Sequence, residues 1–179
     1  MPSTASLTPF SYVVLVLVGE GGAGPHDLVR MMRQGRIYWS ASESQYYAEP
    51  KRLEKLGLLT STKEPGRTHD RTAYRLTDAG RAAVREWLGT PASFPRIQNE
   101  PVVRLLASEY ADDATVLDGL QTLRTEIAEI AAWLERAEQI ETQLPHRSRA
   151  LALNRRLALR IVDAHTAWLD EVEAELGAS

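Results

Sequence analysis

Polar and cationic side chains gather between residues 42 and 71, at spacings that suit contact with an extended anion. Hydroxyl and amide groups come first, two lysines four residues apart follow, and a basic loop closes the segment. Ammonium and guanidinium groups neutralise the phosphates of nucleic acids, whereas amide and hydroxyl groups bond to base edges. The segment therefore predicts a DNA-contacting surface, with these candidates: Ser42, Ser44, Gln45, Tyr47, Lys51, Lys55, Arg67, His69 and Arg71.

The candidates divide by their chemistry. The two lysines and two arginines of the set are expected at phosphates or in the minor groove, and the Tyr47 hydroxyl and the His69 imidazole are expected to donate to phosphates. Ser44 and Gln45 are expected at base edges, because DNA-binding helices read bases from their first turn and a glutamine amide pairs with adenine.

An alternative interpretation makes Lys51 and Lys55 a solvated helix face, with Glu54 as a local partner. Under this interpretation His69 is simply an exposed loop residue. The basic loop that follows the helix favours the DNA interpretation for the lysines.

A helix that begins at Ser42 and ends at Gly57 carries most of these candidates. The Ser42 hydroxyl can cap it while Gln45 reaches back, which is the capping-box pattern. Its apolar residues share one face, at spacings of seven and three: Tyr46, Leu53 and Leu56. Pro50 lies inside the helix and removes a backbone hydrogen bond, so it predicts a kink or a restart.

Two short runs after this helix predict a β-hairpin. Leu58 to Lys63 and Arg71 to Leu76 contain Thr and Leu in partial alternation, and a Pro-Gly pair between them favours a turn. Arg71 and Arg75 share one face of the second strand.

Three further helices complete the N-terminal half. The first is capped by Thr8 and ends at Gly19 to Gly22, although its Val-rich middle also suits a buried strand. The second runs from Pro25 to near Gly35. The third is capped by Thr77, with its inner side formed by Val84, Trp87 and Leu88.

The C-terminal half is predicted to be almost entirely helical. Residues 90–101 hold three prolines and no helical period, which predicts a linker. Apolar residues then repeat at intervals of four and three over residues 116–137, and again over residues 158–176 after a break at Leu144-Pro145. The last helix carries a second stripe: Leu153, Leu157, Ile161 and Trp168. One antiparallel neighbour cannot cover two stripes, so a homodimer is predicted.

Trp133, His165 and Trp168 lie on these paired helices. Large flat rings there fit either the wall of a pocket for an aromatic effector or packing in the dimer seam. The other histidines give His165 no metal-ligand spacing, so neither a metal nor another cofactor is expected.

Composition and charge narrow the possible classes of protein function. The 179 residues carry a net charge of -3, which divides into +3 over residues 1–89 and -6 over residues 90–179. No cysteine is present, which excludes thiolate nucleophiles and Cys-ligated zinc. No apolar run reaches the length of a membrane span, so a cytoplasmic protein with no membrane contact is expected. No paired acid and base suggests an enzyme.

The ordered motifs resemble the PadR family of bacterial winged-helix repressors. The resemblance rests on SxSQ at Ser42 to Gln45, Tyr47, KRLEKLGLL at Lys51 to Leu59 and YRLTDAG at Tyr74 to Gly80, with the C-terminal helical pair similar to that family's dimerisation region. The fold class is then mainly α: residues 1–89 form a winged helix-turn-helix domain with a two-stranded wing, residues 90–101 form the linker, and residues 102–179 form a helical dimerisation domain.

The resemblance implies a sequence-specific transcriptional regulator. As a homodimeric repressor it would bind an inverted-repeat operator in double-stranded DNA, with its third helix in the major groove and its wing over the minor groove, and a small aromatic effector would release it. The alternative is a winged-helix protein-interaction adaptor that does not bind DNA.

Overall fold

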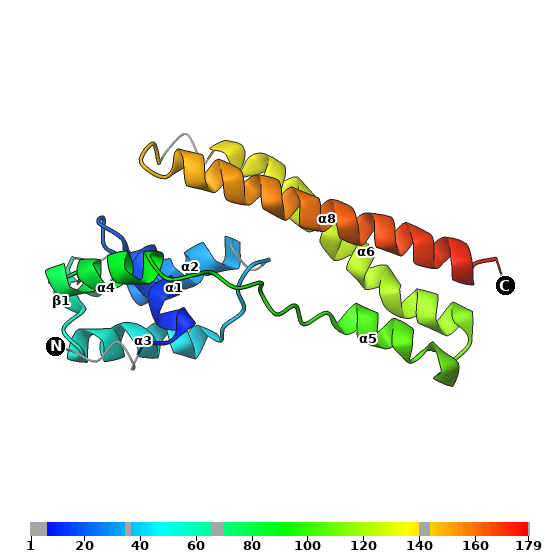
Figure 1. Cartoon of the computed structure of the whole chain (residues 1–179), viewed down its shortest axis with the longest axis horizontal. Helices are drawn as coiled ribbons and strands as arrows, with labels where there is room; N and C mark the ends of the chain where they lie inside the picture. The colour runs from blue at the N-terminus through cyan, green and yellow to red at the C-terminus, as the bar shows by residue number, and fades with distance from the viewer. Residues whose placement is uncertain (1–6, 35–36, 66–69, 140–143, 179) are drawn as a thin grey trace. The chain divides into compact units, whose positions relative to one another are not determined.

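The computed structural model describes residues 7–34, 37–65, 70–139 and 144–178 (Figure 1). These described residues are mainly helical with one two-stranded antiparallel sheet, as the sequence predicted. The chain divides into two compact units, Met1–Phe94 and Pro95–Ser179. No helix among the described residues combines the length and apolar character that a membrane span requires.

The first unit begins with α1 (Pro9–Val18), so the Val-rich segment is a helix and not a buried strand. Thr8 Oγ1 accepts a hydrogen bond from the backbone N–H of Ser11 at 3.2 Å, and Ser11 Oγ accepts one from the backbone N–H of Thr8 at 2.9 Å. This reciprocal cap fixes the start of the helix. Burial of Val14 and Leu15 then stabilises a sequence with only modest helix propensity.

α2 (Pro25–Gln34) and α3 (Glu43–Lys55) follow where the sequence predicted them. α3 continues through Pro50 as one helix, so the helix does not restart there. Pro50 is buried on the same inner face as Tyr46 and Leu53, and this apolar burial offsets the backbone hydrogen bond that proline cannot make.

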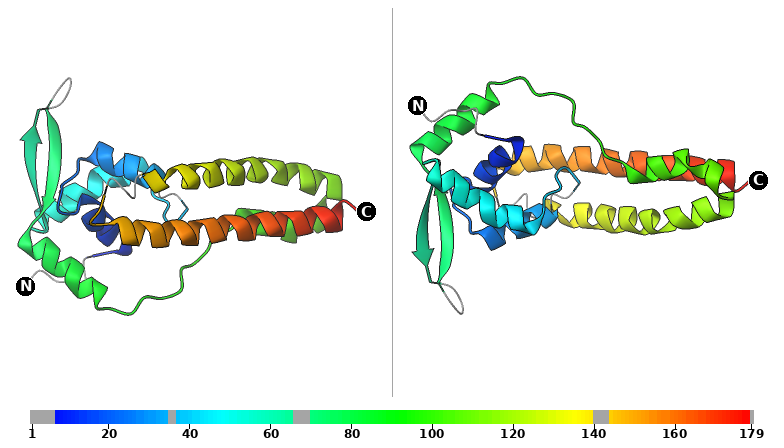
Figure 2. Two further views of the ribbon diagram at one scale, coloured as in Figure 1. Left: turned by 90° about the horizontal axis from the view of Figure 1, so that it is seen from above. Right: turned by 90° about the horizontal axis from the view of Figure 1, so that it is seen from below.

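β1 (Leu59–Glu64) and β2 (Arg71–Leu76) form the predicted hairpin, which we call the wing and which projects from the helices of its unit (Figure 2). The register pairs Leu59 with Leu76 at one end and Glu64 with Arg71 at the other. A further antiparallel bridge joins Tyr74 to Ala23, with both backbone hydrogen bonds at 3.0 Å. The segment between α1 and α2 therefore anchors the wing.

α4 (Asp78–Leu88) begins where Thr77 Oγ1 accepts a hydrogen bond from the backbone N–H of Gly80 at 3.1 Å. Trp87 and Leu88 were predicted on its inner side, and for these two residues the prediction was wrong: both are exposed, Leu88 by 70%. Only the first two turns of α4 reach the core, and the Trp87 ring stacks on Tyr12 with centroids 4.8 Å apart. The core of the unit comprises Val14, Leu15, Val18, Ala23, Leu28, Val29, Tyr46, Leu53, Leu58, Leu59, Tyr74 and Ala83.

The second unit follows residues 91–99, which have no regular secondary structure. It contains α5 (Glu100–Leu106), a short 3-10 helix η2 (Ser108–Tyr110), α6 (Asp113–Arg136) and α8 (Ser148–Leu176). α6 and α8 lie side by side and run in opposite directions (Figure 2).

The predicted apolar repeats form the contact between these two helices. The buried residues are Leu120, Ile127 and Leu134 on α6 and Ala158, Val162, Leu169 and Val172 on α8. Arg124 on α6 adds ion pairs to Asp170 at 2.8 Å and Glu173 at 3.0 Å on α8. The second stripe of α8 is only partly covered within the single chain, because Leu153 and Leu157 are each 50% exposed.

Candidate nucleic-acid interface

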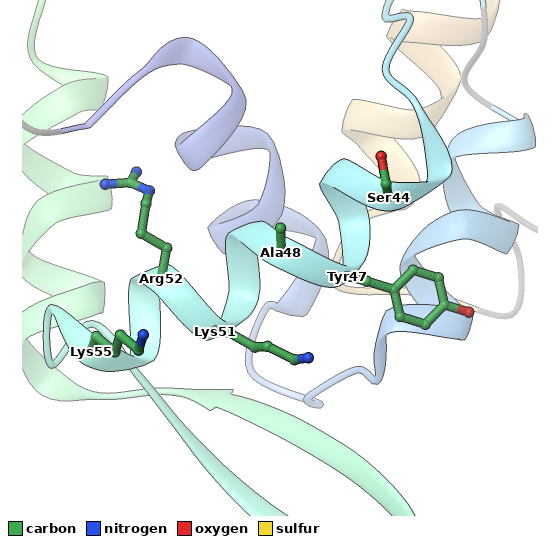
Figure 3. A pocket seen from close by; sticks show the side chains of 6 residues that line it. All are labelled: Ser44, Tyr47, Ala48, Lys51, Arg52 and Lys55. Carbon is green, nitrogen blue, oxygen red and sulfur yellow. The ribbon is translucent and has the colours of Figure 1, made fainter.

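The outer face of α3 forms an open depression of about 620 Å³ (Figure 3). Its lining residues recur at the three- and four-residue spacing of one helix face: Ser44, Tyr47, Ala48, Lys51, Arg52 and Lys55. Four of the nine sequence-predicted site residues therefore lie together on one surface. Ala48 and Arg52 were not predicted, although the same helical spacing includes them.

Lys51 and Lys55 are exposed on this face, and no carboxylate of the described chain lies within 4.0 Å of either ammonium group. Glu54, the proposed local partner, instead accepts hydrogen bonds from Ser61 on β1, from the backbone N–H at 3.1 Å and from the hydroxyl at 2.6 Å. Glu54 thus joins α3 to the wing, and the positive charge of the two lysines is available to an external anion.

The start of α3 holds two further candidates, Ser42 and Gln45, beside Ser44. Gln45 Oε1 accepts hydrogen bonds from the backbone N–H of Ser42 at 2.8 Å and from its hydroxyl at 3.1 Å. The Ser42 and Ser44 hydroxyl oxygens lie 2.9 Å apart. The contact with the backbone N–H of Ser42 fixes the start of the helix, and the other two join side chains. The Gln45 oxygen is therefore engaged within the protein, whereas the Tyr47 side chain is exposed beside the lysines.

Arg52 extends from this face toward α1 (Figure 3). Its Nε and Nη2 donate to the two oxygens of Glu49 at 2.9 and 2.6 Å, and Nη2 also donates to Ser11 Oγ at 2.9 Å. Burial acts to raise the pKa of Glu49, but hydrogen bonds from Arg52 and Ser11 and the charge of Arg52 together lower it below its ordinary value. The hydrogen bond to Glu49 raises the pKa of Arg52. This contact ties α3 to the start of α1.

The arginines of the wing differ from the lysines of α3, whereas Lys63 on β1 donates from Nζ to Thr72 Oγ1 at 2.9 Å. Arg71 lies 3.1 Å from Glu64 and 3.7 Å from Asp27, and Arg75 lies 3.2 Å from Glu64. Arg67 and His69 lie outside the described residues. Their place in the site stays a prediction.

The segment from α1 to α4 is also what the chain shares with known proteins. Residues 17–86 match the model of the PadR-like family of transcriptional regulators. This segment of the chain is PadR-like. The match covers α2, α3, the wing and most of α4, and so includes the whole candidate interface.

Relatives of the family support the assignment. The negative transcriptional regulator PadR of Bacillus subtilis is 28% identical over 102 residues, which span 55% of this chain and 51% of that relative. Its crystal structure with operator DNA has the same fold, with a TM-score of 0.81 and 19% identity over 95% of this chain and 98% of that one. The same protein solved with p-coumaric acid has a TM-score of 0.71 over 94% and 98% of the two chains, at 19% identity.

A third likeness is to the Vibrio cholerae virulence activator AphA. Its structure has a TM-score of 0.71 and 28% identity, covering 94% of this chain and 98% of that one. Both C-terminal and N-terminal units are included in these matches. The PadR winged-helix architecture predicted from the sequence is confirmed.

The three candidates of the second unit are half-buried: Trp133 on α6, and His165 and Trp168 on α8. His165 Nδ1 lies 2.8 Å from the carbonyl oxygen of Ile161, and Nε2 lies 3.2 Å from Asn99 Nδ2. A neutral imidazole that donates from Nδ1 and accepts at Nε2 satisfies both contacts. Among the described residues no ring contact joins the two tryptophans, and no group of three potential metal ligands occurs.

Proposed function

We propose that this chain is a homodimeric repressor that binds an inverted-repeat operator in double-stranded DNA and is released by a small aromatic effector. The observation that carries the proposal is the outer face of α3, where Lys51 and Lys55 are exposed beside Tyr47 with no carboxylate of the described chain within 4.0 Å. Cations that are not neutralised within the protein are the ones that phosphates bind at least cost.

In this proposal α3 lies in the major groove and the wing lies over the minor groove. Lys51 and Lys55 contact phosphates, and Tyr47 donates its hydroxyl to another. Ser44 contributes to base reading from the first turn of the helix, and Gln45 reads a base only with its amide nitrogen while its oxygen stays in the cap. Ser42 holds the helix start. Arg71, with Arg67 and His69, supplies the flanking contacts of the wing.

The second unit is proposed to form the dimer. Its described surface exposes apolar side chains on α8 and around α5, namely Leu153, Leu157, Val103, Leu106 and Tyr110. A second copy of the chain would remove these side chains from water, and the two-fold symmetry of the dimer would match an inverted repeat.

Repression and effector release are proposed from the relatives. The Bacillus subtilis protein is named a negative regulator and has been solved with p-coumaric acid. In this chain Trp133, His165 and Trp168 are the proposed effector-pocket or dimer-seam residues. Binding alone then accounts for the function, without an enzymatic reaction.

A binding selection from fragmented genomic DNA tests the proposal. We expect full-length protein to enrich one or a few fragments that contain an inverted repeat with half-sites about one helical turn apart. A promoter fused to a reporter should be less active in the presence of the protein, and p-coumaric acid serves as a first effector probe. Failure to enrich any sequence at low salt, with a co-purifying protein partner, would instead favour the adaptor interpretation.

A further inference from the structure

The wing holds its arginines against carboxylates of the same unit. Glu64, in register with Arg71, accepts a hydrogen bond from Arg71 Nη2 at 3.1 Å on one oxygen and from Arg75 Nη2 at 3.2 Å on the other. Asp27 adds a second carboxylate 3.7 Å from Arg71 Nη1. Asp27 is shared with Arg30, whose Nη2 lies 3.2 Å from its other oxygen, so three guanidinium groups face two carboxylates in the protein without DNA.

The lysines of α3 present the opposite situation. Within the described chain neither Lys51 nor Lys55 has a carboxylate within 4.0 Å. The candidate interface therefore combines two kinds of cation: ammonium groups without a carboxylate partner, and guanidinium groups that already contact carboxylates. Long-range attraction to DNA depends on uncompensated charge, so in this region it comes from the two lysines of α3 and from Lys63 on β1, whose Nζ donates to the Thr72 hydroxyl.

We propose that Glu64 is a specificity-determining residue that occupies the place of a DNA phosphate between Arg71 and Arg75. This inference rests on the proposed function. In a loose complex with unrelated DNA, phosphates stay too far away to replace a carboxylate in direct hydrogen-bond contact. In the operator complex, α3 is seated in the groove and holds the wing close to the backbone, so phosphates replace Glu64 and the arginines add their contacts.

The exposure of these groups makes such an exchange feasible. Arg71 is 58% exposed, Arg75 50% and Glu64 28%, so the guanidinium groups are already largely hydrated. Exposed ion pairs stabilise a fold only weakly, and removing this one should leave the wing folded. The backbone register of the hairpin and its bridge to Ala23 hold the strands independently of Glu64.

The test compares full-length wild type with Glu64→Gln, using both the selected operator and an unrelated duplex of equal length. We expect the variant to bind the unrelated duplex roughly three- to tenfold more tightly and with a steeper dependence on salt, by about one unit of the logarithmic slope. Operator affinity should change less, so the ratio of operator to unrelated affinity should fall. Glu86→Gln is the matched control, because it removes the same charge from an exposed position of α4.

A double-mutant cycle separates this effect from a general change in net charge. In a background with Arg71→Gln and Arg75→Gln, Glu64→Gln should have no more effect than Glu86→Gln. An unchanged affinity ratio, an equal gain on both duplexes, or weaker binding by Glu64→Gln would overturn the inference; weaker binding would mean that Glu64 supports the arginines. If wild type bound no operator at all, the proposed function itself would fail first.

Discussion

At the scale of single residues, some charged side chains of α3 pair within the protein and others have no carboxylate partner among the described residues. Glu49 and Arg52 form a bidentate pair that also contacts Ser11, whereas Lys51 and Lys55 one turn apart on the same helix have no such partners among the described residues. Neighbouring cations of one helix therefore have different roles. Arg52 positions α3 against α1, and the lysines are the cations that we propose to contact DNA.

Glu49→Gln tests the positioning role of this pair. The folded-state pKa of Glu49 lies below its ordinary value, so its charged form stabilises the fold above that value, and this contribution is lost as the pH falls through the folded-state pKa. We expect the variant to be less stable than wild type at pH 7, by about 1–3 kcal/mol, and the difference to shrink below about pH 4.

Denaturant unfolding at pH 7 and at pH 3 to 4 measures this difference. Glu86→Gln, at an exposed position, is the control and should leave stability unchanged at both pH values. A loss of stability of the same size at every pH would show that the side-chain amide is a packing defect and that the charge of Glu49 has no part.

At the scale of elements, α4 packs very closely against the start of the wing at Gly80. A Cβ atom on Gly80 would overlap the carbonyl oxygen of Leu58, and the same carbonyl oxygen accepts a hydrogen bond from the backbone N–H of Thr77 at 3.1 Å. Gly80 is therefore required by proximity, although glycine is a poor helix former.

Gly80→Ala should destabilise the first unit by about 1–3 kcal/mol, because the steric cost exceeds the gain of about 1 kcal/mol that alanine brings to a helix. Gly21→Ala is the matched control: a Cβ there meets nothing within 4 Å, and Gly21 does not have a positive φ. Thermal unfolding measures the stability of both variants. Equal stability of the two would refute the close packing of α4.

The sequence predicted the elements better than their limits and contacts. Caps at Thr8, Ser42 and Thr77 and the alternating strand sequences of the wing are local signals, so the helices and the hairpin were found where they occur. The helical period predicted which face of α4 is apolar. It did not predict that the core ends before Trp87 and Leu88. Pairing of Arg52 with Ser11 joins residues 41 positions apart, and no local pattern encodes it.

The candidate site shows the same division. Spacing alone placed Ser44, Tyr47, Lys51 and Lys55 on one face, and it also includes Ala48, which side-chain chemistry gave no reason to select. That Glu54 bonds to Ser61 and not to the lysines depends on how α3 packs against β1, which is a tertiary property. The DNA contacts of these residues stay a prediction.

At the scale of the whole molecule, the proposed dimer depends on apolar surface of the second unit. Leu153 and Leu157 lie one turn apart on α8, each 50% exposed. Replacing both with arginine should convert a dimer into a monomer, because two charges would be buried in an apolar contact. Sedimentation of the full-length protein at micromolar concentration measures the change.

Asp163→Arg is the control for this experiment, since Asp163 is exposed on the solvent side of the same helix. It should remain dimeric. A wild-type protein that sediments as a monomer would contradict the dimer, and a dimeric double variant would move the contact away from this face of α8. Loss of the dimer should also weaken operator binding, because the two half-sites are no longer bound by one particle.

The salt dependence of operator binding tests the central claim that α3 presents free cations to DNA. For wild type we expect affinity to fall steeply with added salt, and for Lys51→Ala combined with Lys55→Ala we expect weaker binding and a logarithmic salt slope shallower by about two, with the fold and the oligomeric state unchanged. The same affinity and the same slope in the two proteins would show that these lysines do not contact DNA and would contradict the account.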